Sequence, residues 1–195
     1  KPDYPEAHNN LGTLLHALGK FEQAEASLKK AIDLKPDYAE AHSNFGALLK
    51  ELGEVEESET SFKKAIKLEP NYAEAHNNLG ILFQELAKLE EAEASFRKAT
   101  ELKSDYAEAH RHLASIKKFV SRDKQFLKML ELYQRENISE KQCCHINFAL
   151  AKAYEDLGDY EQSFNHYKEG NSLRKKLLNY NISQDLKLFT QLKTS

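Results

Sequence analysis

The sequence has no tryptophan, one methionine, four prolines and two cysteines among its 195 residues. It has no apolar run of about 18 residues, the length needed to cross a membrane, so we expect no membrane-spanning helix and no membrane partner. The cysteines, Cys143 and Cys144, are adjacent, and such a pair forms no disulfide framework. This cysteine usage fits a reducing compartment, and we expect a cytoplasmic location.

A strong excess of charge of either sign is also lacking, since the net charge is −3. Acidic side chains outnumber basic ones over residues 1–106, and the reverse holds over 107–195. Neither part is basic enough to suggest nucleic-acid binding. The sequence also has no glycine-rich phosphate loop and no distinctive nucleophile–base spacing. We therefore expect no catalytic site, no cofactor and no nucleic-acid partner.

A phrase recurs every 34 residues. It reads Pro-Asp-Tyr-Pro-Glu-Ala-His from Pro2 and returns with small changes from Pro36, Pro70 and Ser104. A fixed period of this length predicts an array of stacked helical units, which usually works through its extended surface. The opening residues Lys1–Tyr4 match the end of such a unit, so we expect that the chain is part of a longer array.

Residues 39–72 illustrate one unit. Apolar residues at helical spacing predict a first helix that ends at Gly53 and a second that ends before Pro70. A glycine recurs inside the first helix at Gly12, Gly46 and Gly80. Because glycine costs about 1 kcal/mol against alanine inside a helix, we expect close packing there.

These positions resemble the tetratricopeptide repeat (TPR) family. The resemblance rests on Leu11-Gly12, Phe45-Gly46, Leu79-Gly80, Gly19, Gly53, Ala24, Ala92, Leu28, Phe62, Phe96, Ala31, Ala65, Ala99, Pro36 and Pro70. It implies an all-α, right-handed superhelical solenoid of antiparallel helix pairs. The aromatic residue that the family usually has on the first helix is replaced by His8, His42, His76 and His110.

The pattern predicts four parts. These are three regular 34-residue units over 1–106, an irregular pair over 107–138, a fifth TPR-like unit over 139–178 and a capping or connector helix over 179–195, centred on 183–193. In the irregular pair, helices are expected over 107–119 and 124–135. Phe126, Leu127, Leu130 and Tyr133 are expected to face inward, and Ser139 is expected to open a capping box with Gln142.

Polar residues recur along the first helices, whose faces line the concave surface in TPR arrays. We predict a partner-binding surface formed by Asn9, Asn10, Asn44, Lys50, Asn77, Asn78, Gln84, Arg111, His112 and Lys118. Asparagine offers a donor and an acceptor, which suits an extended peptide backbone. The row resembles the asparagine ladder of nucleocytoplasmic O-linked N-acetylglucosaminyltransferases. The alternative is that asparagine merely tolerates a polar helix surface.

Other rows have simpler explanations. Glu6, Glu40, Glu74 and Glu108 could line a groove for a basic peptide or could stabilise helix N-termini. The four histidines lie on different repeats, too far apart to share one metal ion, so we expect a packing role and no metal. A chaperone-type carboxylate clamp is disfavoured, because Glu74 and Glu108 stand where basic residues are expected.

The C-terminal segment carries a second resemblance. The run from Phe148 to Tyr160, with Gly170-Asn171, Arg174-Lys175-Lys176 and Tyr180, is similar to the TPR region that precedes the sulfotransferase domain of bacterial TPR–sulfotransferase proteins. Three hypotheses follow. The chain is a non-catalytic scaffold that binds a peptide or protein segment, or the targeting arm of a sulfotransferase whose catalytic domain lies beyond residue 195, or an array that self-associates through exposed ends.

Overall fold

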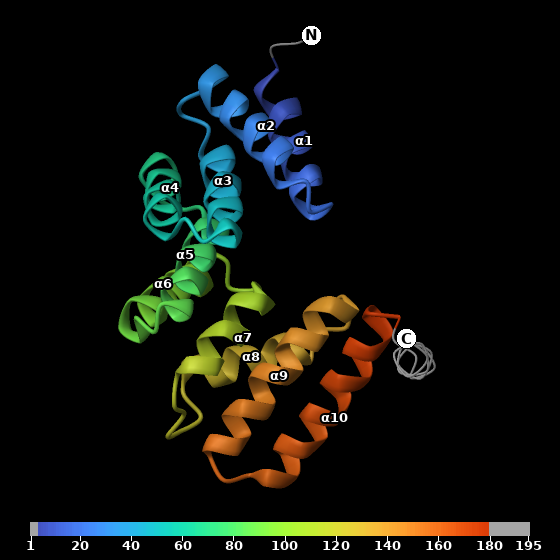
Figure 1. Ribbon diagram of the computed structural model, residues 1–195. Coiled ribbons are helices and arrows are strands. Elements are labelled where there is room, and N and C mark those ends of the chain that lie inside the picture. Colours follow the sequence, from blue (N-terminus) through green and yellow to red (C-terminus); the bar gives the residue numbers. More distant parts are fainter. Residues whose placement is uncertain (1–3, 180–195) are drawn as a thin grey trace, which may run out of the picture. The chain divides into compact units, whose positions relative to one another are not determined.

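A computed structural model describes residues 4–179, which form ten α-helices and no β-strand (Figure 1). The helices are α1 (Pro5–Ala17), α2 (Phe21–Leu34), α3 (Ala39–Leu52), α4 (Val55–Leu68), α5 (Ala73–Glu85), α6 (Leu89–Leu102), α7 (Ala107–Ile116), α8 (Lys124–Tyr133), α9 (Glu140–Asp156) and α10 (Tyr160–Leu177). The predicted all-α class is confirmed. The helix predicted over 183–193 lies outside the described residues.

The chain divides into two compact units, one containing α1–α6 and the other α7–α10. Within the first unit the helices pair in sequence order, α1 with α2, α3 with α4 and α5 with α6 (Figure 1). Each pair stacks on the next through contacts of α2 with α3 and of α4 with α5. None of the helices over 4–179 combines the length and the apolarity that a membrane crossing requires.

Glycine allows the two helices of each pair to approach closely. A Cβ atom placed on Gly46 would lie 2.9 Å from ring carbon Cδ1 of Phe62, and one on Gly80 would lie 2.6 Å from Cε1 of Phe96. Both rings are fully buried. Gly12 has the same relation to Leu28, at 2.6 Å from Cγ. The predicted packing role of these glycines is confirmed, since any larger residue would collide with a core side chain.

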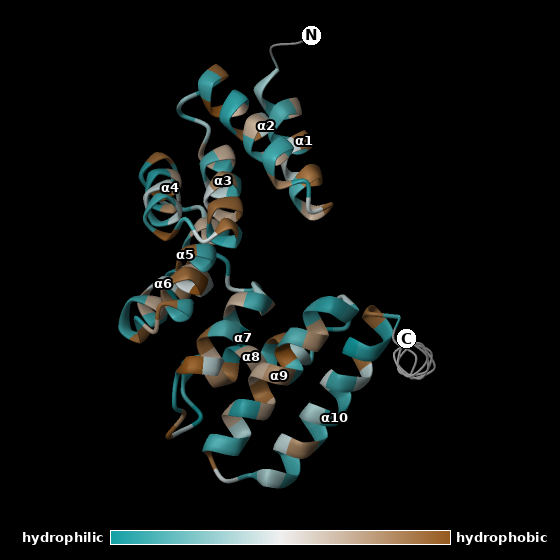
Figure 2. Cartoon of the chain, viewed as in Figure 1, coloured by the Kyte–Doolittle hydropathy of each residue, from teal (hydrophilic) through white to brown (hydrophobic). Residues whose placement is uncertain are grey.

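Small residues on the second helices complete this contact. Ala24, Ser58 and Ala92 occupy equivalent positions and are fully buried. The serine adds a hydroxyl to an apolar interface, and its Oγ donates a 2.8 Å hydrogen bond to the carbonyl oxygen of Gly46. The polar atom is therefore satisfied inside the core, as burial requires. Hydrophobic and hydrophilic residues alternate around these helices (Figure 2), as expected for helices buried on one face.

The second unit is built around α9, which contacts α7, α8 and α10. Its core includes Phe119, Phe126, Met129, Ile146 and Leu150. Two expectations for this region were wrong. Helix α7 ends at Ile116 rather than Phe119, because Lys117 adopts an extended conformation. This conformation brings Phe119 into the core, where its backbone N–H donates to Oδ2 of Asp156 at 3.1 Å.

The inward face of α8 agrees with the prediction at Phe126, Leu130 and Tyr133, which belong to the core or pack against it, and differs at Leu127. Leu127 is 55% exposed, whereas Phe126, Met129 and Leu132 are buried. Asp123 caps this helix, accepting a 3.0 Å hydrogen bond from the backbone N–H of Phe126. The predicted capping box of α9 is confirmed.

The turns inside the pairs require a left-handed residue. Gly19 and Gly53 have φ angles of 70° and 79°, and Ala87 holds the equivalent position in the third pair with a φ of 57°. A left-handed conformation costs an L-residue roughly 1–2 kcal/mol, whereas glycine adopts it without steric penalty. The third turn is therefore the strained one.

We predict that Ala87→Gly stabilises the chain by about 1 kcal/mol, because it removes this steric cost. The measurement is the urea midpoint of unfolding. Gly53→Ala is the matched reverse change and should lower the midpoint. A variant that unfolds at the same urea concentration as the parent chain would show that the turn carries no strain.

Candidate functional site

The polar pairs on α1, α3 and α5 separate into a buried row and an accessible row. The first members, Asn9, Ser43 and Asn77, are at most 1% exposed. The second members are exposed at Asn10 and half-buried at Asn44 and Asn78. Neighbouring positions on a helix with 3.6 residues per turn point about 100° apart, so one member faces the core while the next faces outward.

The two rows are joined by hydrogen bonds between helices. Asn44 Nδ2 donates to Asn9 Oδ1 at 2.9 Å, and Asn78 Nδ2 makes a longer contact of 3.5 Å with Ser43 Oγ. Each bond links residues 35 positions apart, one repeat plus one residue. The amides of Asn44 and Asn78 are thus oriented by contacts with the preceding helix pair.

Carboxylates at the start of the first helices take part in the same network. Glu40 accepts a 3.0 Å hydrogen bond from Asn9 Nδ2 and a 3.2 Å bond from the Tyr38 hydroxyl. Burial, followed by the negative charge of Glu40, raises the pKa of Tyr38 to about 12, so the hydroxyl stays a donor at neutral pH. Glu74 forms an ion pair with Lys103 at 2.7 Å. Glu40 and Glu74 of the acidic row thus bind side chains of other helices or turns.

A second series of polar links crosses the ends of the first helices. Lys50 Nζ lies 2.7 Å from Glu85 Oε1, and His16 Nε2 lies 3.0 Å from Glu51 Oε2. These pairs are also 35 positions apart. Gln84 is half-buried at the position equivalent to Lys50 on α5. A basic residue followed by an acidic residue 35 positions later is therefore a sequence signal for an ion pair between first helices. Comparison of equivalent positions 34 residues apart does not detect it.

Lys118 follows Gln84 by one period but does not lie on a helix. Because α7 ends at Ile116, Lys118 stands in the connection to α8 and is exposed. Its charge acts instead on Asp156 of α9, where it helps to lower the pKa of that carboxyl, after the larger effects of Lys152 and the Phe119 backbone.

Arg111 is the centre of a polar cluster in the second unit. Its Nε donates to His145 Nδ1 at 3.0 Å, and its Nη2 lies 2.6 Å from His112 Nε2. Burial, together with the charge of Arg111, lowers the pKa of His112 to about 3. Burial also lowers the pKa of His145. Both imidazoles are therefore neutral at physiological pH. Within residues 4–179, Arg111 has these two imidazoles and no carboxylate at hydrogen-bonding distance.

A cavity of about 420 Å³ opens beside this cluster. It is lined by Arg111, Lys141, Cys144, His145, Phe148, Arg174, Leu177 and Leu178. Helices α7, α9 and α10 contribute these residues. Of the predicted surface residues, only Arg111 lines this cavity. Lys141 and Arg174 were missed because they lie outside the periodic rows.

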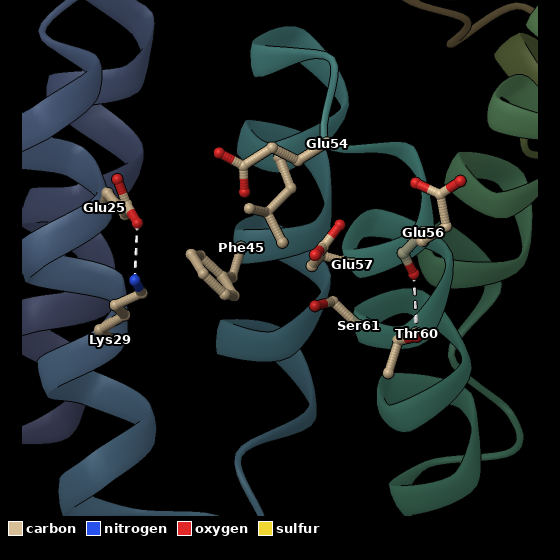
Figure 3. Close-up of a pocket in the computed structure, with 9 residues that line it drawn as sticks. Glu25, Lys29, Phe45, Glu54, Glu56, Glu57, Thr60 and Ser61 are labelled. Carbon is tan, nitrogen blue, oxygen red and sulfur yellow. Dashed lines mark hydrogen bonds and ion pairs between the residues drawn. The ribbon is translucent and has the colours of Figure 1, made fainter.

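A separate groove of about 410 Å³ lies between α2 and α4 (Figure 3). Phe45 and Leu49 of α3 line its centre, and Lys29 Nζ lies 5.8 Å from the centroid of the Phe45 ring. Four glutamates, Glu25, Glu54, Glu56 and Glu57, lie around it. Glu54 corresponds to Lys88 one repeat later, and Lys88 lies 3.8 Å from Glu59. Glu25 likewise corresponds to Glu59. The groove between α2 and α4 therefore has the carboxylates of Glu25 and Glu54 at the positions where the next repeat has the ion pair of Glu59 and Lys88.

Two members of the histidine row contact the turns between pairs, and the two cysteines are buried or half-buried. The Nε2 atoms of His42 and His76 lie 3.0 and 3.1 Å from the carbonyl oxygens of Pro36 and Pro70 at the turns between pairs. Burial raises the pKa of Cys143 and Cys144, so both thiols are protonated at neutral pH. Within residues 4–179, no group of three or more potential ligands could hold a metal ion.

This fold and these faces define a helical-repeat protein. A family model described as TPR repeat matches residues 12–53 and 46–87, and one described as tetratricopeptide repeat matches 73–106 and 145–177. The chain belongs to the tetratricopeptide repeat family. The matched ranges leave out 107–144, which contains α7, α8 and the start of α9. No curated protein sequence matches the chain significantly.

Solved structures share the fold at low sequence identity. PilF of Pseudomonas aeruginosa is 19% identical, with a TM-score of 0.67 over 86% of this chain and 75% of that one. YrrB, described as a TPR protein with an unusual peptide-binding site, is 16% identical, with a TM-score of 0.60 over 89% and 88%. The first TPR of Spaghetti (RPAP3), solved with an HSP90 peptide, is 24% identical, with a TM-score of 0.54 over 57% and 89%.

The buried imidazole of His112 makes stability depend on pH. Its folded pKa lies below the ordinary value, so the unfolded chain takes up a proton first as the pH falls through about 6.5, and stability is lost from there toward pH 3. We expect a loss of about 2 kcal/mol from this residue between pH 8 and pH 5. His145 and His166 act in the same direction.

The measurement is urea unfolding at both pH values for the parent chain and for His112→Gln. The glutamine can accept a hydrogen bond from Arg111 but cannot be protonated in this range. It should therefore lose about 2 kcal/mol less on acidification. Equal losses in the two proteins would contradict the assignment of this pH dependence to His112.

Proposed function

We propose that the chain is a non-catalytic protein-interaction module that holds an extended peptide segment along the first helices of its pairs. The observation that carries this proposal is the fixed orientation of the Asn44 amide. Its Nδ2 donates one hydrogen to Asn9, which leaves its second N–H and its carbonyl oxygen for a partner. A peptide backbone offers the complementary acceptor and donor at every residue.

The residues around this amide support the same function. Asn10 is exposed, and Asn78, Lys50 and Gln84 are half-buried on the first helices of the same unit. Backbone recognition through amides is independent of partner sequence, whereas Lys50 and Gln84 would select among partners. Two structural relatives, the Spaghetti TPR and YrrB, are described as binding peptides, which supports a peptide ligand at the level of the fold.

We predict that the double variant Asn44→Ala, Asn78→Ala binds peptides about tenfold more weakly, because two amide contacts to the backbone are removed. Peptides are first selected from a displayed random library with the parent chain, and their affinities are then measured by fluorescence anisotropy. Asn165→Ala, an exposed change on α10, is the control. If the double variant and the control bind the selected peptides equally, the asparagine row has no binding role.

The alternative is that this module is the targeting arm of a larger bacterial sulfotransferase. The similarity of residues 148–180 to the connector of such proteins favours it. The decisive observation is the reading frame after Ser195. A sulfotransferase domain there would support the targeting role, and a stop codon would exclude it.

Self-association through an array end is a further proposal. Leu11 and Leu14 on α1, and Leu18 just after it, are about half exposed, at 46%, 56% and 59%. Burial of these apolar side chains against a second copy would lower the free energy of the pair. Light scattering should show a molar mass that rises with concentration, and Leu14→Glu should reduce the rise. A constant monomer mass would argue against this proposal.

A further inference from the structure

Three cationic side chains converge on the cavity of the second unit. Arg111 comes from α7, Lys141 from α9 and Arg174 from α10, and all three line the same space. Each of the three charges lowers the pKa of His145, which follows only if all of them lie near that imidazole. The lining residues include no carboxylate.

Among the described residues, nearby carboxylates offset only part of this positive charge. Glu108 is close enough to oppose the shift at His145 and at Arg111, but it does not line the cavity. Glu140, at the start of α9, is engaged by Lys176. Arg111 is half-buried, and Lys141 and Arg174 are exposed, so solvent screens part of their mutual repulsion. An anion in the cavity would reduce the repulsion that remains. The arrangement therefore suits a ligand with one negative group.

The other side of the cavity is apolar. Phe148 is half-buried, and Leu177 and Leu178 are 46% and 67% exposed at the end of α10. The cavity volume of about 420 Å³ lies within the range of roughly 300–1,000 Å³ found for ligand pockets. A ligand that fills it must place an aliphatic group directly beside its anion. A phosphate-rich polyanion lacks that group.

We propose that this cavity receives a carboxylate of an acidic peptide segment, with the neighbouring aliphatic side chain against Phe148 and Leu177. The carboxylate accepts hydrogen bonds from Arg111 and Arg174, and Lys141 adds charge at the entrance. The proposal rests on the peptide-binding function above and names the chemistry of the partner at the second unit. The carboxylate comes either from a peptide C-terminus or from an aspartate or glutamate side chain.

The minimal probe is N-acetyl-leucine, which carries a carboxylate next to an aliphatic side chain. Titration of the full chain, followed by amide chemical shifts in NMR spectra, should move signals of α7, α9 and α10. N-acetyl-leucinamide lacks the charge and acetate lacks the aliphatic group, so both should bind at least tenfold more weakly. Equal shifts with the neutral amide would overturn the proposal.

Charge variants locate the binding. Arg174→Gln and Lys141→Gln should each weaken N-acetyl-leucine binding about three- to tenfold, because a partly exposed charge-assisted contact is lost. Lys175→Gln removes the same charge from an exposed neighbour of Arg174 that does not line the cavity, and it is the matched control. If all three variants bind alike, the attraction is only the general charge of the surface. Arg111 is left intact because it also holds two imidazoles.

Two peptides separate the sources of the carboxylate. One ends in a leucine with a free carboxylate and has no acidic side chain, and the other has a glutamate before an amidated leucine. Binding of either peptide supports carboxylate binding in the cavity and identifies the source of the carboxylate. If neither peptide binds, the proposal is overturned. The double variant Asn44→Ala, Asn78→Ala changes the first unit only, so it should bind N-acetyl-leucine as the parent chain does. A failure of the asparagine proposal is thereby distinguished from a failure of the cavity proposal.

Discussion

The contact between a glycine on one helix and a large side chain on the next sets the geometry of every regular pair. At Gly46 and Gly80 the ring of Phe62 or Phe96 fills the space that a Cβ would occupy. The two helix backbones are consequently closer than they could be with a Cβ at these positions. Because the same contact recurs with Leu28 at Gly12, the three pairs have similar internal geometry. Polar side chains at equivalent positions then meet equivalent partners.

This constraint explains why the links between pairs repeat. The bond from Asn44 to Asn9 and the contact from Asn78 to Ser43 span 35 positions. The ion pair between Lys50 and Glu85 spans the same interval. A residue on one first helix contacts a residue on the following first helix. The contacted residue stands one position after the equivalent of the first residue. These links between first helices therefore share one geometric rule.

The sequence predicted the parts of the fold that depend on local pattern. Helix pairs, the turn at Gly53, the glycine contacts and the capping box at Ser139 all leave signals within one repeat. The end of α7 leaves no such signal, because the extended conformation of Lys117 depends on Phe119 reaching the core and Asp156, 37 positions away. The exposure of Leu127 on α8 likewise depends on tertiary packing.

The candidate sites divide in the same way. The asparagine rows follow the period and could be identified from sequence, although their division into a buried and an accessible row required the structure. The cavity around Arg111 could not be predicted, since Lys141 and Arg174 come from helices that break the period. The left-handed Ala87 was missed because alanine carries no turn signal.

The 35-position rule also bears on how such an array changes length. If one whole repeat were removed between α1 and α5, Asn78 would stand where Asn44 stands and could donate to Asn9. Glu85 would likewise replace Glu51 opposite His16. Insertion of a repeat would preserve the same pairings at both new junctions. The polar links are thus transferable between repeats, so the array can gain or lose a unit without leaving a buried amide unpaired.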